Sequence, residues 1–296
     1  MTASPAPAGA TPSADLTTPG PDDATAAALA GGVRPRRLGT LYVAEHNLRS
    51  MRSYGWTIVM TGIGNPVMYL LGIGLGLASF LDVPVGFGPD GPVPYVWFVA
   101  PALLATAVVT VGTEEFTYTV MGGFRWRRVF WAMNSSPVAP GQVVGGLVLA
   151  VAARMIFVSV AYTLVVALFG AVGDLRALLL LPLIGVLGGL AFGLPLLAYS
   201  ASLTQDSGQF AAVQRFVFTP MFLFSGTFYP LDTLPTWLHW IGWISPIWHA
   251  SELGRAASFG QATPGWLLCV HVLVLVALAV GGWFVGRRVF VGRLRG

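Results

Sequence analysis

The sequence predicts an all-α membrane protein that crosses the bilayer six times. Of its 296 residues, 55% are hydrophobic and 9% are charged, whereas an ordinary soluble domain carries roughly 25% charged residues. So few charges cannot cover the surface of a globular chain of this size, and apolar segments recur at about the 20 residues that a helix needs to cross a membrane. A soluble enzyme, a secreted disulfide scaffold and a disordered regulator are excluded for the chain as a whole.

Two regions are expected on composition. Residues 1–37 are rich in Ala, Pro, Thr and Gly and contain almost no large apolar side chain, so we predict a disordered N-terminal tail. Residues 38–296 form the membrane domain. Within it, apolar residues of segment 38–54 recur at helical spacing, which favours an interfacial helix lying in the headgroup plane. A cytoplasmic extension of the first span is the alternative.

Six apolar segments are the expected spans. They lie near 57–80, 94–113, 143–169, 177–200, 211–228 and 265–286. The first is interrupted by Asn65-Pro66. Segment 229–264 is also apolar and aromatic, but four prolines punctuate it, so we predict short helices there that form an outer re-entrant segment.

The distribution of arginine predicts the orientation. All 16 basic residues are Arg. With the N-terminus inside, 13 of them fall in cytoplasmic segments, Arg176 and Arg255 fall outside, and Arg154 lies within a span. The positive-inside rule therefore places both termini in the cytoplasm. Membrane orientation also accounts for the net positive charge, and no pattern indicates nucleic-acid binding.

Missing residue types exclude several chemistries. A chain without Lys has no P-loop, because that motif needs a Lys on the nucleotide phosphates, and it forms no Schiff base. One cysteine, Cys269, allows no intramolecular disulfide and no thiolate metal cluster. The four histidines lack metal-ligand spacing. We therefore expect no catalytic residues, and no cofactor or metal bound by this chain.

Arg154 is an intramembrane charge. An Arg at mid-span costs about 2.5 to 3.5 kcal/mol on insertion scales, so it should face protein or water and pair with an acid. Glu114 or Glu115, at the inner end of the preceding span, is the expected partner. The group can be a pathway or gating charge, a buried ion pair, or a side chain that snorkels toward the interface. A membrane-embedded enzyme or a passive channel using these residues is the rival functional hypothesis.

The loop between the second and third spans carries a basic, aromatic run. We predict a short helix that ends at Pro137 and contains Phe124, Arg125, Trp126, Arg127, Arg128 and Phe130. One interpretation is a membrane-surface helix oriented by anionic lipid. The other is a docking element for a cytoplasmic partner, because aromatic and Arg side chains are frequent binding anchors.

Residues 222–255 resemble the C-terminal signature of ABC-2 type permeases. The matching positions are Phe224-Ser225-Gly226-Thr227-Phe228, Pro230, Leu234-Pro235, Pro246, His249 and Arg255. The upstream segments Glu114-Glu115-Phe116-Thr117-Tyr118 and Ser135-Ser136-Pro137 also fit. The branch that the chain resembles most contains the nodulation lipo-oligosaccharide exporter and daunorubicin-type drug exporter permeases, and the resemblance covers residues 40–290.

The resemblance implies partner subunits that supply the functions this chain lacks. Such permeases work in pairs, as homodimers or related heterodimers, in the bacterial cytoplasmic membrane. Each pair binds two copies of a cytoplasmic ATPase subunit, which carries the ATP and Mg²⁺. By this resemblance 124–136 is the coupling helix, and the exported substrate is a drug, a glycolipid or a lipo-oligosaccharide.

Aromatic residues of the fifth span are the candidate translocation path. Phe218 and Phe222 share one helical face and Met221 lies three residues from Phe218. Phe228 is only roughly aligned with them. A pair of permeases could bring this face to a shared interface and form an apolar constriction. The alternative is that these side chains face lipid or pack within one subunit.

Overall fold

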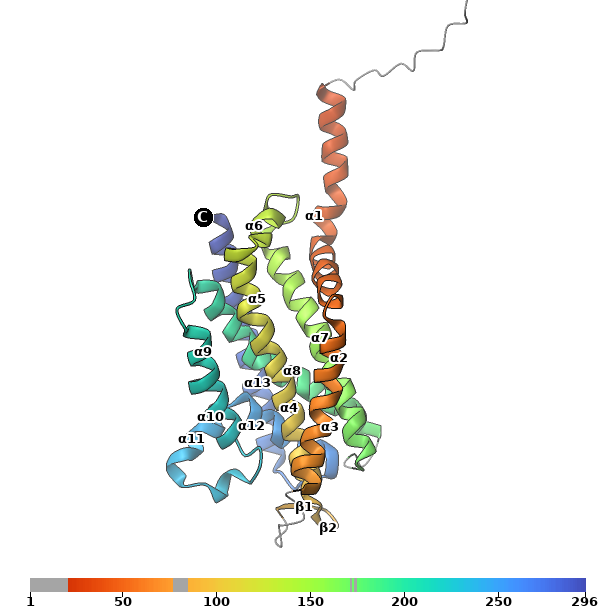
Figure 1. Cartoon of the computed structure of the whole chain (residues 1–296), viewed down its shortest axis with the longest axis vertical. Coiled ribbons are helices and arrows are strands. Elements are labelled where there is room, and N and C mark those ends of the chain that lie inside the picture. The colour runs from red at the N-terminus through yellow and green to blue at the C-terminus, as the bar shows by residue number, and fades with distance from the viewer. Residues whose placement is uncertain (1–20, 77–84, 171, 173–174) are drawn as a thin grey trace, which may run out of the picture.

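Long helices lying side by side make up most of the chain in a computed structural model, which describes residues 21–76, 85–170, 172 and 175–296 (Figure 1). Within these ranges, five helical stretches are long and apolar enough to cross a membrane. They are Gly55–Ile73, Tyr95–Trp126, Pro140–Leu168, Leu175–Ser202 and Gly265–Arg295. They match five of the six predicted spans, although residues 77–80 of the first lie outside the described ranges.

The N-terminal helix α1 (Pro21–Arg52) begins earlier than predicted. Residues 21–37, which composition assigned to a disordered tail, are helical, whereas residues 1–20 lie outside the described ranges. Local preference explains the difference. The stretch after Pro21 is Ala-rich, and Asp22 and Asp23 sit in the first turn, where carboxylates favour the helix dipole.

The segment predicted to lie flat at the interface runs along another helix instead. The second half of α1 packs against α7 (Pro140–Leu168), and Val43 and Ala44 are buried, whereas the first half projects beyond the bundle (Figure 1). Glycine makes this possible, because a Cβ on Gly146 would stand 2.5 Å from the Cβ of Val43 and 2.7 Å from the Thr40 carbonyl oxygen. Close backbone approach through small residues is a common way for helices to pack in lipid.

The first candidate span follows α1 in short pieces. These are α2 (Gly55–Val59), η1 (Met60–Gly64), α3 (Asn65–Tyr69) and η2 (Leu70–Gly76), of which η1 and η2 are π-helical. A small antiparallel hairpin of β1 (Gly86–Gly88) and β2 (Gly91–Val93) comes next, with Gly86 opposite Val93. It leads into α4 (Tyr95–Phe116), the helix most deeply enclosed by others.

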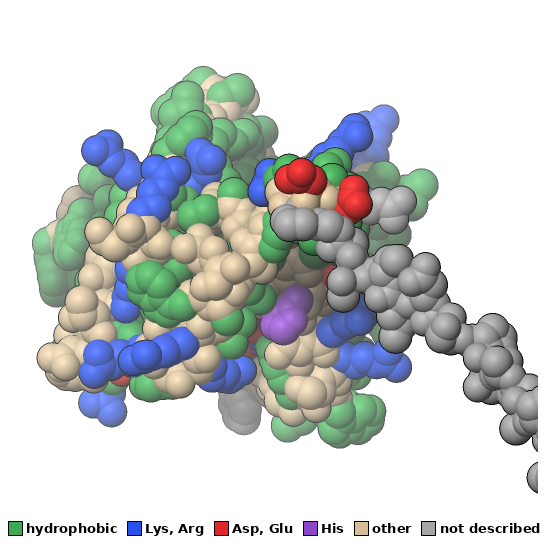
Figure 2. Space-filling view, turned by 90° about the horizontal axis from the view of Figure 1, so that it is seen from above, with side chains coloured by type: hydrophobic (Ala, Val, Ile, Leu, Met, Phe, Trp, Pro, Cys, Tyr) green, Lys and Arg blue, Asp and Glu red, His purple; other side chains and the backbone are tan. Residues whose placement is uncertain are grey.

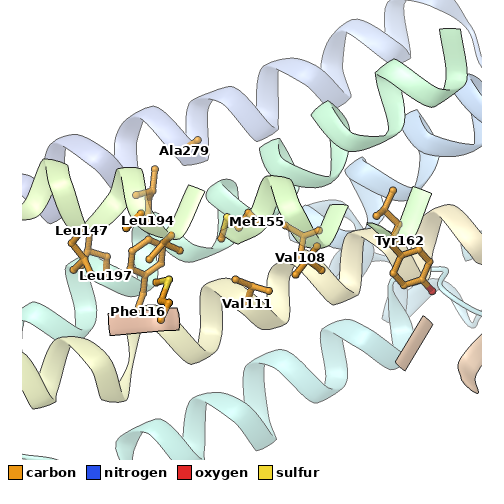
Figure 3. Packing of buried hydrophobic residues seen from close by; sticks show 14 of the residues in the cluster. Val108, Val111, Phe116, Leu147, Met155, Tyr162, Leu194, Leu197 and Ala279 are labelled. Atoms are coloured by element: carbon orange, nitrogen blue, oxygen red, sulfur yellow. The ribbon is translucent and has the colours of Figure 1, made fainter. Parts of the chain in front are cut away.

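The centre of the bundle is formed by α4, α7, α8 (Leu175–Ser202) and α13 (Gly265–Arg295). Figure 3 shows how their buried side chains meet in one continuous cluster. The labelled members are Val108, Val111, Phe116, Leu147, Met155, Tyr162, Leu194, Leu197 and Ala279. α13 also exposes large apolar residues such as Trp266 and Leu273, as expected for a surface in contact with lipid.

The fifth predicted span is shorter than expected. Segment 211–228 forms one helical stretch of α9 (Gln209–Val213), η5 (Gln214–Phe218) and α10 (Thr219–Phe224). It stops at Phe224 because Ser225 leaves the helical region and Gly226 takes a φ of 69°. The stretch is below the about 20 residues of a full crossing, so six complete spans remain a prediction.

The predicted outer segment consists of short helices that fold back onto the bundle. They are η6 (Leu231–Thr233), η7 (Thr236–Leu238), α11 (His239–Ile244) and α12 (Pro246–Phe259). Arg255 of α12 is fully buried. Its guanidinium donates to the carbonyl oxygens of Phe98 at 3.1 Å and Gly226 at 2.6 Å and pairs with Glu252 at 2.7 Å. These bonds fix the start of the outer segment to α4.

Arginine gathers at the opposite end of the molecule from this outer segment. The C-terminus and α6 (Val129–Asn134) lie at the end from which α1 projects (Figure 1). Figure 2 looks onto that end and shows Arg side chains distributed around it. Positive charge is therefore concentrated at one end of the bundle, where most of its basic residues lie.

The packing of α1 on α7 predicts opposite effects for two glycine substitutions. Gly146→Ala should lower the free energy of unfolding by about 1 to 3 kcal/mol, because its methyl group overpacks the contact with Val43. Gly281→Ala on α13 is the control, since no atom lies within 4 Å of its Cβ position, and its stability should be unchanged or higher. Thermal unfolding in detergent measures both, and equal midpoints would contradict the close contact.

Candidate functional site

A three-residue charge cluster lies between α4 and α7. Arg154 of α7 donates through Nη2 to the Glu114 carboxylate at 2.8 Å, and through Nη1 to the Glu115 carboxylate. The predicted pairing is thus present, and the Arg engages both acids rather than one. Adjacent residues diverge by 100° around a helix, but a long guanidinium side chain reaches both because its two terminal nitrogens point apart.

Two side chains of the cluster are buried and the third is exposed. The side chains of Arg154 and Glu115 are 9% and 4% exposed, whereas that of Glu114 is 53% exposed. With both carboxylates ionised, the cluster carries one net negative charge. Removing one partner from a buried pair leaves the other charge unpaired in a medium of low dielectric, which is far more costly than losing a surface pair.

Two hydroxyl groups complete the surroundings of Glu115. The Tyr54 hydroxyl and the Thr119 hydroxyl each donate to its carboxylate at 3.4 Å. Burial, and next the negative charge of Glu115, raise the pKa of Tyr54 to about 12. Tyr54 is therefore protonated at neutral pH and remains a hydrogen-bond donor, which ties the junction after α1 to the charge cluster.

The cluster opens into a cavity of about 260 Å³ between the first candidate span, α4, α7 and η5–α10. Glu114 and Arg154 line one end of it. The other polar lining residues are Thr61, Asn65, Tyr69, Thr106, Thr110 and Tyr162. Hydroxyl, amide and charged groups therefore line a cavity between helices that are long and apolar enough to cross a membrane.

The α4 wall of the cavity follows from helical spacing. Thr106, Thr110 and Glu114 recur every four residues and so share a face. The two Thr hydroxyls donate to the carbonyl oxygens of Ala102 and Thr106, each at 2.9 Å, which leaves the hydroxyl oxygens free to accept further hydrogen bonds. Opposite them, the buried Tyr162 hydroxyl has no hydrogen-bond partner within the described ranges.

Aromatic rings form the remaining wall. Phe218 and Phe222 line the cavity, with ring centroids 6.4 Å apart and nearly parallel planes. Phe228 packs edge-on against Phe222 at 5.1 Å and lies behind this wall. Met221 points elsewhere and packs with Val109 and Ile247. Two of the four predicted path residues therefore meet the predicted intramembrane charge in one cavity, which the sequence alone did not indicate.

The predicted coupling helix is broken in two. A π-helical turn, η4 (Gly122–Trp126), ends the stretch that continues α4 through α5 (Tyr118–Met121). α6 starts only at Val129, after Arg128 adopts a left-handed backbone with φ 52°. This conformation is uncommon for a residue other than glycine, and it turns the chain so that α6 does not continue the direction of η4.

Burial divides the six predicted coupling residues. Phe124 and Phe130 are each 3% exposed and pack on each other and on Phe290 of α13, with centroids 4.6 to 5.0 Å apart. These two rings hold the segment against α13, and because they are buried they are not accessible to a binding partner. The exposed members are Arg125, Trp126, Arg127 and Arg128, and Trp131 and Ala132 of α6 extend the same surface.

Several cavity residues carried no motif that sequence reasoning could have used. Asn65 and Tyr162 come from two separate helical stretches, the first candidate span and α7, and only the fold brings them to the cavity that Glu114 lines. The Thr106–Thr110–Glu114 spacing was the one available signal. No group of three or more His, Cys, Asp or Glu side chains able to hold a metal occurs in the described part of the chain.

Comparison with known proteins agrees with the architecture. The family model described as ABC-2 type transporter matches residues 41–259. Nodulation protein J of Rhizobium leguminosarum bv. viciae is 30% identical over 257 residues, which are 87% of this chain and 95% of that protein. Nodulation protein J of Rhizobium leguminosarum bv. trifolii is 28% identical over 267 residues, 90% of this chain and 97% of that protein. The family match includes the charge cluster and every residue that lines the cavity.

The charge cluster predicts a large loss of stability when its cation is removed. Arg154→Ala should lower the free energy of unfolding by about 3 to 5 kcal/mol, because Glu115 is then buried without a cationic partner. Arg49→Ala is the matched control, since Arg49 pairs with Glu45 at an exposed position and should cost less than about 1 kcal/mol. Thermal unfolding in detergent measures both.

A second variant distinguishes the effect of the unpaired charge on stability from the effect of lost side-chain packing. Arg154→Ala/Glu115→Gln should recover part of the loss, because no ionised carboxylate is then left buried beside the truncated residue. An Arg154→Ala protein as stable as Arg49→Ala would contradict a buried, paired charge at this position.

Proposed function

Because the chain belongs to the ABC-2 type transporter family and is the permease subunit of an ATP-binding cassette exporter, we propose that it moves an amphipathic substrate across the bacterial cytoplasmic membrane. The substrate class is a drug, a glycolipid or a lipo-oligosaccharide. Family membership disfavours the rival hypothesis of a membrane-embedded enzyme or passive channel built on Arg154 and Glu114 or Glu115.

The observation that carries the substrate proposal is the mixed lining of the cavity. Polar groups of α4 and the first candidate span face the aromatic pair Phe218 and Phe222 across it. An amphipathic molecule matches this lining, with its polar part against the hydroxyls and its apolar part against the rings. The single net negative charge of the cluster favours a neutral or cationic polar part over an anionic one.

The energy source follows from the family and from the residues that are missing. An ABC-2 permease works with an ATPase subunit, and this chain has no Lys for a P-loop. We propose two ATPase copies, which carry ATP and Mg²⁺, bound to a pair of permease subunits. Both termini are cytoplasmic in this arrangement, because the Arg-rich end of the bundle then faces inward.

The coupling surface in this proposal is the exposed part of the segment between α5 and α7. Arg127 and Ala132 present it, and the buried Phe124 and Phe130 hold it against α13. A rigid base of this kind lets motion of the ATPase reach α4 through η4 and α5, which continue α4 toward the Arg-rich end.

The cavity predicts that one aromatic residue controls substrate transport. In inverted membrane vesicles containing the permease and its copurifying ATPase, Phe222→Ala should slow ATP-dependent uptake of a fluorescent cationic amphiphile about fivefold or more, because a ring contact with the substrate is lost. Phe216→Ala is the control, since Phe216 is 78% exposed on the same helical stretch and does not line the cavity.

Both variants should still be expressed as folded protein, although Phe222→Ala loses the ring contacts with Phe218 and Phe228 and should unfold at a lower temperature than Phe216→Ala. Uptake that is the same in Phe222→Ala and the parent, or uptake of a small polar solute instead of amphiphiles, would contradict the proposed path and cargo.

The coupling surface predicts loss of ATPase docking without loss of folding. Arg127→Glu/Ala132→Asp should abolish copurification of the ATPase and ATP-dependent uptake, because two new negative charges enter a desolvated contact. Arg127→Lys/Ala132→Ser keeps charge and size nearly unchanged and should behave as the parent. Pull-down of the ATPase measures the effect, and undiminished binding by the charge-reversed variant would rule out this surface.

A further inference from the structure

We propose that the Arg-rich end of the molecule holds a binding site for the phosphate headgroup of an anionic phospholipid. The site is a cavity of about 770 Å³ lined by η4 and α6, by Thr204 in the loop after α8, and by the end of α13. It is separate from the cavity at Arg154 and requires only that this chain lies in a membrane, so it does not depend on the substrate or on the ATPase.

Three arginines converge on this cavity from distant parts of the chain. Arg125 and Arg128 come from the segment before α6, and Arg293 comes from the last turn of α13. The Thr204 hydroxyl also lines it, whereas no carboxylate does. Guanidinium groups bind phosphate through paired, charge-assisted hydrogen bonds, and a hydroxyl adds a neutral donor.

Arg293 is held in place before any ligand arrives. Its Nη1 donates to the carbonyl oxygens of Ala201 at 2.9 Å and Leu203 at 2.6 Å. The guanidinium lies 4.2 Å above the ring of Phe124. Because its position is fixed by α8 and by the buried aromatic cluster, this cation loses little conformational entropy when an anion binds.

The positive charge of the cavity is not neutralised from within the described ranges. None of the ion pairs found there involves Arg125, Arg128 or Arg293. Asp206 is the acid closest in sequence to Thr204, and its Oδ1 accepts hydrogen bonds from the backbone N–H groups of Gly208 at 3.0 Å and Phe210 at 3.5 Å. It therefore caps the start of α9.

Neighbouring surfaces favour a lipid as the source of the phosphate. Trp126 and Trp131 line the cavity and are 61% and 37% exposed, and indole rings concentrate at the headgroup level of membranes. A largely apolar groove of about 550 Å³ between α8, η5 and α11 includes Tyr199. Tyr199 lies two residues before Ala201 in α8, whose carbonyl oxygen binds Arg293, so the groove and the Arg-lined cavity border the same end of α8 and an acyl chain in the groove accompanies a phosphate near Arg293.

The test uses the full chain purified in a neutral detergent, without its ATPase. Dioctanoyl phosphatidylglycerol and dioctanoyl phosphatidylcholine are titrated separately, and binding is followed by native mass spectrometry and by the unfolding midpoint. Phosphatidylglycerol should bind and raise the midpoint, whereas phosphatidylcholine should bind far more weakly. Arg125→Gln/Arg128→Gln should weaken phosphatidylglycerol binding about 30-fold.

Arg287→Gln/Arg288→Gln is the matched control. It also removes two exposed positive charges from the same end of the molecule, but neither residue lines the cavity, so its affinity should stay within about twofold of the parent. If this control weakens binding as much as the cavity variant, the attraction is a general surface charge effect and the proposed site is wrong.

Three further outcomes would overturn the proposal. One is equal binding of the two lipids. Another is inorganic phosphate that binds as tightly as phosphatidylglycerol, which would make the site one for a free anion. The third is an Arg125→Gln/Arg128→Gln protein that keeps the lipid affinity but no longer binds the ATPase, which would assign the cavity to an acidic side chain of that partner.

Discussion

The structure depends on the rule that a cation withdrawn from water must have a partner. Arg154, Arg255 and Arg293 each meet it at a different level of the bundle, through two carboxylates, through two carbonyls and a carboxylate, and through the carbonyls of Ala201 in α8 and Leu203 just after it. In each case at least one partner belongs to another helix or loop. The three arginines therefore connect elements that apolar packing alone would leave free to slide, because dispersion contacts have little directional preference.

α4 links these levels into one mechanical unit. Near its start, Phe98 accepts a hydrogen bond from Arg255 of the outer segment, and near its end Glu114 and Glu115 bind Arg154. Its continuation through α5 and η4 reaches the exposed Arg-rich surface. One continuous helical stretch thus connects the exposed Arg-rich surface with the cavity and with the segment held by Arg255, which is the route that the proposed coupling requires.

How much the sequence could predict depends on how local each signal is. Span positions follow from runs of apolar residues, and five of them coincide with long apolar helical stretches of the structure where it describes them, although Tyr95–Trp126 and Gly265–Arg295 continue well beyond the predicted ends at 113 and 286. The Arg154 pairing was predictable because a buried charge needs a partner and two acids end the preceding span. Burial of Phe130 was not, since its partner Phe290 lies 160 positions away. The break at Arg128 was also hidden, because no glycine marks the left-handed residue.

Local helix preference overturned one expectation and tertiary contact another. Composition favoured disorder before residue 38, yet the Ala-rich stretch from Pro21, with two carboxylates in its first turn, extends α1 as a helix. Amphipathic spacing favoured a helix lying in the headgroup plane, yet Gly146 lets that helix lie against α7 instead. The two histidines that sequence spacing left unpaired, His249 and His271, meet with their Nδ1 atoms 2.7 Å apart. Only the packing of α12 on α13 brings them together.

The size of the cavity constrains how a permease of this kind can act. At about 260 Å³ it is smaller than the roughly 300 to 1,000 Å³ that drug-sized ligands occupy, so a complete amphipathic substrate does not fit in this conformation. Phe218 and Phe222 form its aromatic wall, and the stretch that carries them is the short helical segment ending at Phe224. Arg154 joins the α4 and α7 walls through its ion pairs, whereas none of these ion pairs reaches η5–α10 or the first candidate span. Binding of a complete substrate therefore requires a wider cavity than this one, and the walls that the charge cluster leaves unjoined are the ones whose displacement would widen it without breaking a buried ion pair.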